Sequence, residues 1–129
     1  MTDLSPVSQI LLEARALLSS PSKWTRTSLA KGADKFSVNP YSPFATCWCL
    51  DGALIKAFKT LRFPKSAYDD AMYVLAREID PKGGLVKSVV WDWNDDPSRT
   101  YEEVVALLEA AILRERAKRD SQGSSEGLS

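Results

Sequence analysis

The segment 46–54, with the sequence TCWCLDGAL, has the residue types most suited to chemistry. Apolar spacing predicts a helix over about 46–61, which places Cys49 in its first turn. There the positive end of the helix dipole and free N–H groups lower the pKa of a thiol and favour the thiolate. Cys49 is therefore a candidate nucleophile. The competing interpretation is a packed thiol, because free cysteine is among the most buried residue types.

A second candidate is the segment 91–100, with the sequence WDWNDDPSRT. Its carboxylates could act as a general base or hold a hard cation, and they belong to Asp92, Asp95 and Asp96. The spacing does not match a calcium loop. If the backbone is extended here, Trp91 and Trp93 face the same side. We expect the two tryptophans to plug the core, while the acids are solvated or cap a turn. This interpretation includes no metal and no cofactor.

Basic residues are concentrated in the first half of the chain. Residues 1–65 contain nine Lys and Arg against four Asp and Glu, whereas residues 66–129 contain eight against thirteen. One explanation is that the two halves attract and dock. The other is a basic edge that meets an acidic partner or nucleic acid, with Trp24 available to stack on a base. The basic residues of this edge are Lys23, Arg26, Lys31 and Lys35.

The composition excludes several classes of function. The chain of 129 residues has no histidine, so Ser-His-Asp and Cys-His catalysis and His-based zinc sites are excluded. Its two cysteines, Cys47 and Cys49, cannot complete a four-ligand zinc site and are expected as thiols. The first residues do not have the pattern of an export signal, and no apolar run approaches the length of a membrane span. These features predict a cytoplasmic protein without a membrane segment.

Periodicity predicts a mainly α protein, a small single domain over 1–119. It has a short β-hairpin at about 23–38 between helices one and two, and a disordered tail over 120–129. The run 85–93 is too short to assign. The four helices are expected over about 6–19, 46–61, 65–79 and 101–119.

Local signals refine these helices. The Ser5-Pro6 pair predicts the start of the first helix, Ser66 caps the third, and Thr100 with Glu103 forms a capping box before the fourth. Gly52 inside a helix implies that something bulky packs against it. We expect that neighbour to be an indole, from Trp24, Trp91 or Trp93.

Four short motifs occur in a fixed order along the chain. They are W-T at 24–25, C-x-x-G-A-L at 49–54, W-N-D at 93–95 and T-x-E-E-V at 100–104. In this order and spacing, over roughly residues 7–113, the chain resembles a family of short uncharacterised proteins from bacteria and their phages. The resemblance implies no activity, cofactor or catalytic residue. It only marks matched positions, which either line a solvent-open site or hold the fold together. These positions are Trp24, Cys49, Gly52, Ala53, Trp93, Asn94 and Asp95.

Three functional hypotheses follow from these patterns. The leading one is a non-catalytic interaction module or accessory protein, phage-related and inhibitor-like, that binds a protein partner. The second is nucleic-acid binding through the basic hairpin. The third is an enzyme that uses a Cys49 thiolate or the acids Asp92 and Asp95. The expected binding residues are Trp24, Arg26, Lys31, Lys35, Asp92, Asn94 and Asp95.

Overall fold

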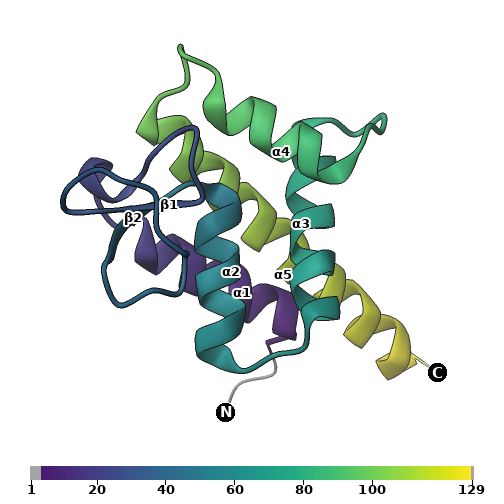
Figure 1. Cartoon of the computed structure of the whole chain (residues 1–129). Helices are drawn as coiled ribbons and strands as arrows, with labels where there is room; N and C mark the ends of the chain where they lie inside the picture. Colours follow the sequence, from purple (N-terminus) through teal and green to yellow (C-terminus); the bar gives the residue numbers. More distant parts are fainter. Residues whose placement is uncertain (1–3, 129) are drawn as a thin grey trace.

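The fold is mainly helical, as predicted, with one two-stranded sheet (Figure 1). This computed structural model describes residues 4–128 and the side chains of residues 4–118. In the described part the helices are α1 (Pro6–Leu17), the short 3-10 helix η1 (Pro21–Lys23), α2 (Leu50–Leu61), α3 (Lys65–Ile79), α4 (Val86–Asp95) and α5 (Tyr101–Leu128). The strands are β1 (Ala30–Gly32) and β2 (Ala45–Trp48).

The core lies where α1 packs against α2, α3 and α5, while α4 covers the end of α3 and contacts α2 (Figure 1). Burying one large aliphatic side chain contributes roughly 1.5–3 kcal/mol to stability. The largest fully buried apolar side chains are Ile10, Leu11, Leu18, Leu50, Leu54, Met72, Leu75 and Leu108.

Two of the predicted helix starts are confirmed. The Oγ of Ser5 accepts a hydrogen bond from the Ser8 N–H at 3.1 Å. The capping box before α5 has both of its reciprocal hydrogen bonds. The Glu103 N–H donates to the Thr100 Oγ1 at 3.2 Å, and the Thr100 N–H donates to the Glu103 Oε1 at 2.9 Å. The bounds of α3 are those predicted, but its cap is Pro64, so the prediction of a Ser66 cap is wrong.

The predicted hairpin over 23–38 has the wrong second strand. β1 pairs antiparallel with β2, in the register Ala30 with Trp48, Lys31 with Cys47 and Gly32 with Ala45. The segment 36–38 reaches β1 only through an isolated bridge. Because residues 45–48 are extended, α2 begins four residues later than predicted.

The unassigned run 85–93 lies almost entirely in the helix α4. The described residues therefore form five α-helices, one more than the four predicted. Its apolar residues Val86, Val89, Val90 and Trp93 recur at helical spacing over only ten residues, too short a length for periodicity to identify.

None of the described helices has the length and apolar character of a membrane span. The backbone of α5 continues to Leu128, beyond the end of the helix predicted over 101–119. The predicted domain limit at 119 and the predicted disorder of 120–129 fall on residues whose side chains lie outside the described part. Both stay predictions.

Candidate functional site

The side chain of Asn94, on α4, joins three distant parts of the chain. It is 1% exposed, and its Oδ1 accepts hydrogen bonds from the Trp24 Nε1 at 2.8 Å and from the Leu50 N–H at 3.1 Å. Its Nδ2 donates to the Thr25 carbonyl at 3.2 Å and to the Asp95 Oδ1 at 2.9 Å. We call these five residues the Asn94 network. It brings the W-T, C-x-x-G-A-L and W-N-D motifs together.

A buried carboxylate forms a second junction beside this network. Asp51, in the first turn of α2, is 2% exposed. It accepts hydrogen bonds from the Tyr68 hydroxyl on α3 at 2.5 Å and from the Trp91 Nε1 on α4 at 2.6 Å. Burial, together with the bond to Asp51, raises the pKa of Tyr68. Sequence reasoning missed Asp51, although a single acid within an apolar helix stripe was a usable signal.

Gly52 is packed against backbone, and the prediction of a covering indole is wrong. A Cβ at this position would lie 1.8 Å from the Leu29 carbonyl oxygen. The same oxygen accepts the Cys49 N–H at 3.1 Å. The glycine is therefore required for the segment before β1 to lie directly on the start of α2.

Trp91 and Trp93 would share one side only on an extended backbone, and this segment is helical. The expectation that both plug the core is wrong for Trp91, which is 43% exposed. Successive side chains in a helix are about 100° apart, so residues two apart do not share a face. The Trp91 N–H bonds Asp51, whereas the Arg99 guanidinium lies 3.8 Å from the centroid of the Trp93 ring.

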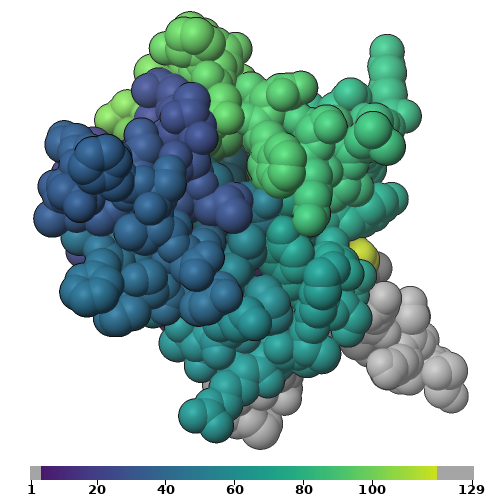
Figure 2. All heavy atoms as spheres, in the orientation of Figure 1, coloured from purple at the N-terminus to yellow at the C-terminus, as the bar shows by residue number. Residues whose placement is uncertain are grey.

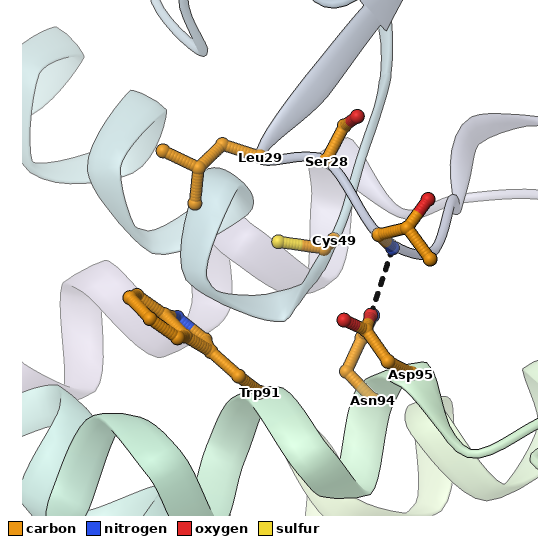
Figure 3. Close-up of a pocket in the computed structure, with 7 residues that line it drawn as sticks. Ser28, Leu29, Cys49, Trp91, Asn94 and Asp95 are labelled. Atoms are coloured by element: carbon orange, nitrogen blue, oxygen red, sulfur yellow. Dashed lines mark hydrogen bonds between the residues drawn. The ribbon is translucent and has the colours of Figure 1, made fainter.

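Beside the Asn94 network is a pocket of about 230 Å³, shown in Figure 3, which we call the Asp95 pocket. In this view the Cys49 sulfur points into the space between Leu29 and Trp91, with Asn94 and Asp95 on the opposite side. Cys49, Asn94 and Asp95 therefore have two roles: their hydrogen bonds hold the fold together, and they also line the pocket. The lining residues are Thr27, Ser28, Leu29, Cys49, Trp91, Asn94 and Asp95.

Cys49 does not have the lowered pKa that its place at a helix start predicts. It is the N-cap of α2, is 6% exposed, and its Sγ accepts the Gly52 N–H at 3.3 Å. Burial raises the pKa of the thiol to about 12, outweighing the bond from Gly52, and the negative charge of Asp51 acts in the same direction as burial. At neutral pH the group is a protonated thiol.

A larger hollow of about 680 Å³, the lysine groove, adjoins the same part of the chain. It contains three of the predicted binding residues, Trp24, Lys31 and Lys35. Figure 2 shows the blue residues between α1 and α2 as one lobe beside the green residues of α4. The lining residues are Ser22, Lys23, Trp24, Thr25, Lys31, Gly32, Ala33, Lys35, Thr46 and Cys47.

Arg26 lines neither hollow. Its guanidinium lies 4.5 Å from the Trp24 ring centroid and donates to two backbone carbonyls after α4, those of Asp96, at 3.2 Å, and of Arg99. It therefore fastens the segment after η1 to the turn that follows α4. Asp92 is exposed on α4 and lines neither hollow.

The acids of the W-D-W-N-D-D segment do not form one cluster. The Asp95 Oδ1 accepts the Thr27 N–H at 2.9 Å, and Asp96 instead accepts the N–H and hydroxyl of Ser98, which lower the Asp96 pKa. Within the described residues, no group of three or more His, Cys, Asp or Glu is placed to hold a metal ion.

The matched motifs and both hollows fall within one family model, DUF6197, a family of unknown function, which covers residues 2–114. No curated protein and no solved structure matches the chain. The expected resemblance to an uncharacterised family is confirmed. Because the model covers most of the chain, the protein belongs to DUF6197, a family of unknown function.

Proposed function

We propose that the protein is a non-catalytic binding module of the cytoplasm, which receives an acidic segment of a partner protein in the lysine groove. One observation carries the proposal. Lys23, Lys31 and Lys35 line a single groove whose described lining includes no acidic residue. Once the acidic segment is bound in the groove, the partner can no longer use that segment to bind other molecules. The module would thus act as a small inhibitor protein.

The electrostatics of the groove favour an anionic partner. A single exposed ion pair contributes only about 0–1 kcal/mol, but several like charges along one groove attract a complementary chain together and accelerate its association. Lys31 lies on β1, and Lys35 lies on the turn that follows it. A short sheet and its turn therefore fix the spacing of two of the three charges.

Nucleic acid is the alternative occupant of the same groove, and the contacts of Trp24 favour a protein over it. Base stacking requires a free ring face. The guanidinium of Arg26 lies over the Trp24 ring, and the indole N–H bonds Asn94. Arg26, a second residue expected to bind nucleic acid, is bonded to backbone carbonyls after α4.

The enzymatic alternative has less support from the geometry. A nucleophilic cysteine requires a thiolate, and burial raises the pKa of Cys49 to about 12. Asp95, the other candidate, has its Oδ1 bonded to Thr27 and Asn94, where it positions the backbone of the segment 24–27. Each residue has a structural contact that requires no reaction: Cys49 caps α2, and Asp95 connects α4 to Thr27.

Fluorescence anisotropy with two probes tests the proposal. The probes are a labelled oligoglutamate peptide and a labelled thymidine oligonucleotide of equal net charge. We expect the peptide to bind more tightly, and its binding to weaken as salt is raised. In the double variant Lys31→Glu with Lys35→Glu, peptide affinity should fall by about tenfold or more, because attraction becomes repulsion.

The matched control is the double variant Lys82→Glu with Lys87→Glu, which changes the net charge equally at exposed lysines outside the groove. It should bind the peptide nearly as the unmodified protein does. Equal losses in both double variants, or no peptide binding at low salt, would contradict the proposal. Tighter binding of the oligonucleotide would replace it with the nucleic-acid alternative.

A pull-down extends the test to the cell. The tagged protein is expected to recover one stoichiometric partner, and the groove variant to lose it while the Lys82 and Lys87 control retains it. Recovery of the same partner by the groove variant would place the interface elsewhere.

A further inference from the structure

The Asp95 pocket is separate from the lysine groove, and no residue lines both. Much of its wall is apolar or weakly polar, formed by Leu29, the Cys49 thiol and Trp91 (Figure 3). Trp91 is 43% exposed although its N–H is held by buried Asp51. The indole is therefore fixed in place while part of its surface faces the opening.

Asp95 provides the charge of this pocket. Its Oδ1 is occupied by the N–H groups of Thr27 and Asn94, each at 2.9 Å. Its Oδ2 has no hydrogen-bond partner, and the carboxylate has no ion-pair partner, within the described residues. An oriented carboxylate oxygen thus borders an apolar space with an aromatic wall.

These features together select one kind of ligand. An anion is disfavoured by Asp95, and a metal ion requires more ligands than one carboxylate supplies. An aliphatic chain fits the wall of Leu29 and Cys49, and a terminal cation is stabilised both by a carboxylate and by an indole. The volume of about 230 Å³ lies below the usual range for drug-sized ligands, about 300–1,000 Å³, and suits one side-chain-sized group.

We propose that the Asp95 pocket binds an alkylguanidinium or alkylammonium group, the chemistry of an arginine or lysine side chain and of a small free amine. The ligand's aliphatic chain lies between Leu29 and Trp91, and its cation pairs with Asp95. The site is preorganised, because the Asn94 network and Asp51 hold its walls before any ligand arrives. It uses other residues than the lysine groove, so either proposal can fail without the other.

Titration of ¹⁵N-labelled protein with butylguanidinium, followed by NMR, tests this site. The neutral isostere butylurea is the control ligand. We expect saturable shifts of the Trp91 indole N–H and of the Leu29 and Cys49 amides. Butylguanidinium should bind about tenfold more tightly than butylurea, the preference that one charge-assisted contact provides.

The variant Asp95→Asn keeps an oxygen that can accept the Thr27 N–H and removes the charge. It should bind the two ligands equally, whereas Asp92→Asn, on the same helix outside the pocket, should keep the preference. If Asp95→Asn does not fold, Leu29→Trp fills the pocket from an exposed side chain and should abolish binding.

Three outcomes would overturn the proposal. They are equal binding of both ligands to the unmodified protein, a preference that survives in Asp95→Asn, and shifts confined to acids elsewhere on the surface. A free amine and a partner's side chain are distinguished by a second titration with an arginine-containing tripeptide blocked at both ends. Tighter binding of the tripeptide than of butylguanidinium indicates a protein source, and weaker binding indicates a small amine.

Discussion

The Asp95 pocket and the lysine groove adjoin one segment of the chain, residues 22–29, and differ in how their walls are held. In the pocket, Asn94 and Asp95 are fixed by hydrogen bonds to backbone and side chains of other elements. In the groove, Lys31 and Lys35 lie on a three-residue strand and an exposed turn. Substitutions of Asn94 should therefore act mainly on folding, whereas substitutions of Lys31 and Lys35 should act mainly on binding.

The two cysteines give the largest expected contrast, because Cys47 lines the groove and Cys49 lines the pocket. Raising a thiol pKa from 9.0 to about 12 lowers its thiolate fraction about a thousandfold at neutral pH. We expect iodoacetamide to modify partly buried Cys47 faster than buried Cys49 in the folded protein. Mass spectrometry of the two peptides over time measures both rates.

The pH dependence of the iodoacetamide reaction tests whether the raised pKa of Cys49 causes its low reactivity. The Cys49 rate should rise about tenfold per pH unit well beyond pH 9, because its thiolate fraction keeps growing until the pH approaches 12. A Cys49 rate that levels off near pH 9, or that equals the Cys47 rate at neutral pH, would show that the pocket does not bury the thiol. Denaturant should make both cysteines reactive, which provides the positive control.

Two glycines provide the next contrast. A Cβ on Gly52 would meet the Leu29 carbonyl oxygen at 1.8 Å, so Gly52→Ala must push the backbone off α2 and break the bond from Cys49 to that carbonyl. We expect a loss of about 4 kcal/mol or more in the free energy of unfolding. Gly32, in the groove, has its nearest neighbours at 3.3 Å. Gly32→Ala should cost about 1 kcal/mol or less.

Urea denaturation of both variants, followed by circular dichroism, makes the measurement. Similar losses for Gly52→Ala and Gly32→Ala would contradict the close approach of the segment 27–29 to α2. A Gly52→Ala variant that does not fold at all agrees with the expectation, provided that Gly32→Ala folds normally.

Asn94 and Asp92, two positions apart on α4, form a third matched pair. Asn94→Ala leaves the Trp24 indole N–H and the Leu50 N–H without their acceptor inside the protein. Each buried unsatisfied donor costs about 1–3 kcal/mol, so we expect a total loss of about 2–3 kcal/mol, after partial rehydration. Asp92→Ala, at an exposed position, should stay within about 0.5 kcal/mol.

Thermal unfolding of the two alanine variants compares them under one condition. An Asn94→Ala variant as stable as Asp92→Ala would mean that the Asn94 network does not connect the three motifs. Loss of stability in both would instead indicate that α4 as a whole tolerates no substitution.

Much of the fold was predictable, because its signals are local. The bounds of α3 and the Thr100 box depend on residues within a few positions of one another. The second strand was missed because residues 45–48 become a strand only by pairing with β1, about fifteen residues earlier. The apolar spacing of Cys47, Leu50 and Leu54 also fits a helix, so the local pattern favoured the wrong element.

The site was less predictable than the fold. Sequence reasoning selected Trp24, Asn94 and Asp95, yet the bond between Trp24 and Asn94 spans seventy residues, and nothing in either segment indicates the other. The orientation of Trp91 and Trp93 depended on whether their segment is extended or helical, and ten residues are too few for apolar spacing to decide between the two. Arg26 was selected for its charge, and its role as a donor to carbonyls after α4 depends on where that turn lies.

The smallest expected change in stability is at Lys35, where one substitution should raise stability and weaken binding. Lys35 has a φ of 72°, in the left-handed region that costs a non-glycine residue about 1–2 kcal/mol. Lys35→Gly relieves this strain and makes the unfolded chain more flexible, so the net gain in stability should be about 0.5 kcal/mol. The same change removes one charge from the lysine groove. Affinity for the oligoglutamate peptide should therefore fall severalfold while the melting temperature rises.

Arg62→Gly is the control for this last prediction. Arg62 follows α2, has a φ of 61° and does not line the groove. It should gain a similar stability, since glycine is the preferred residue after a helix, and it should leave peptide affinity unchanged. If both variants gain stability and only Lys35→Gly loses affinity, the Lys35 charge acts in recognition. If Lys35→Gly keeps its affinity, contact with the partner is confined to the part of the groove around Lys23 and Lys31.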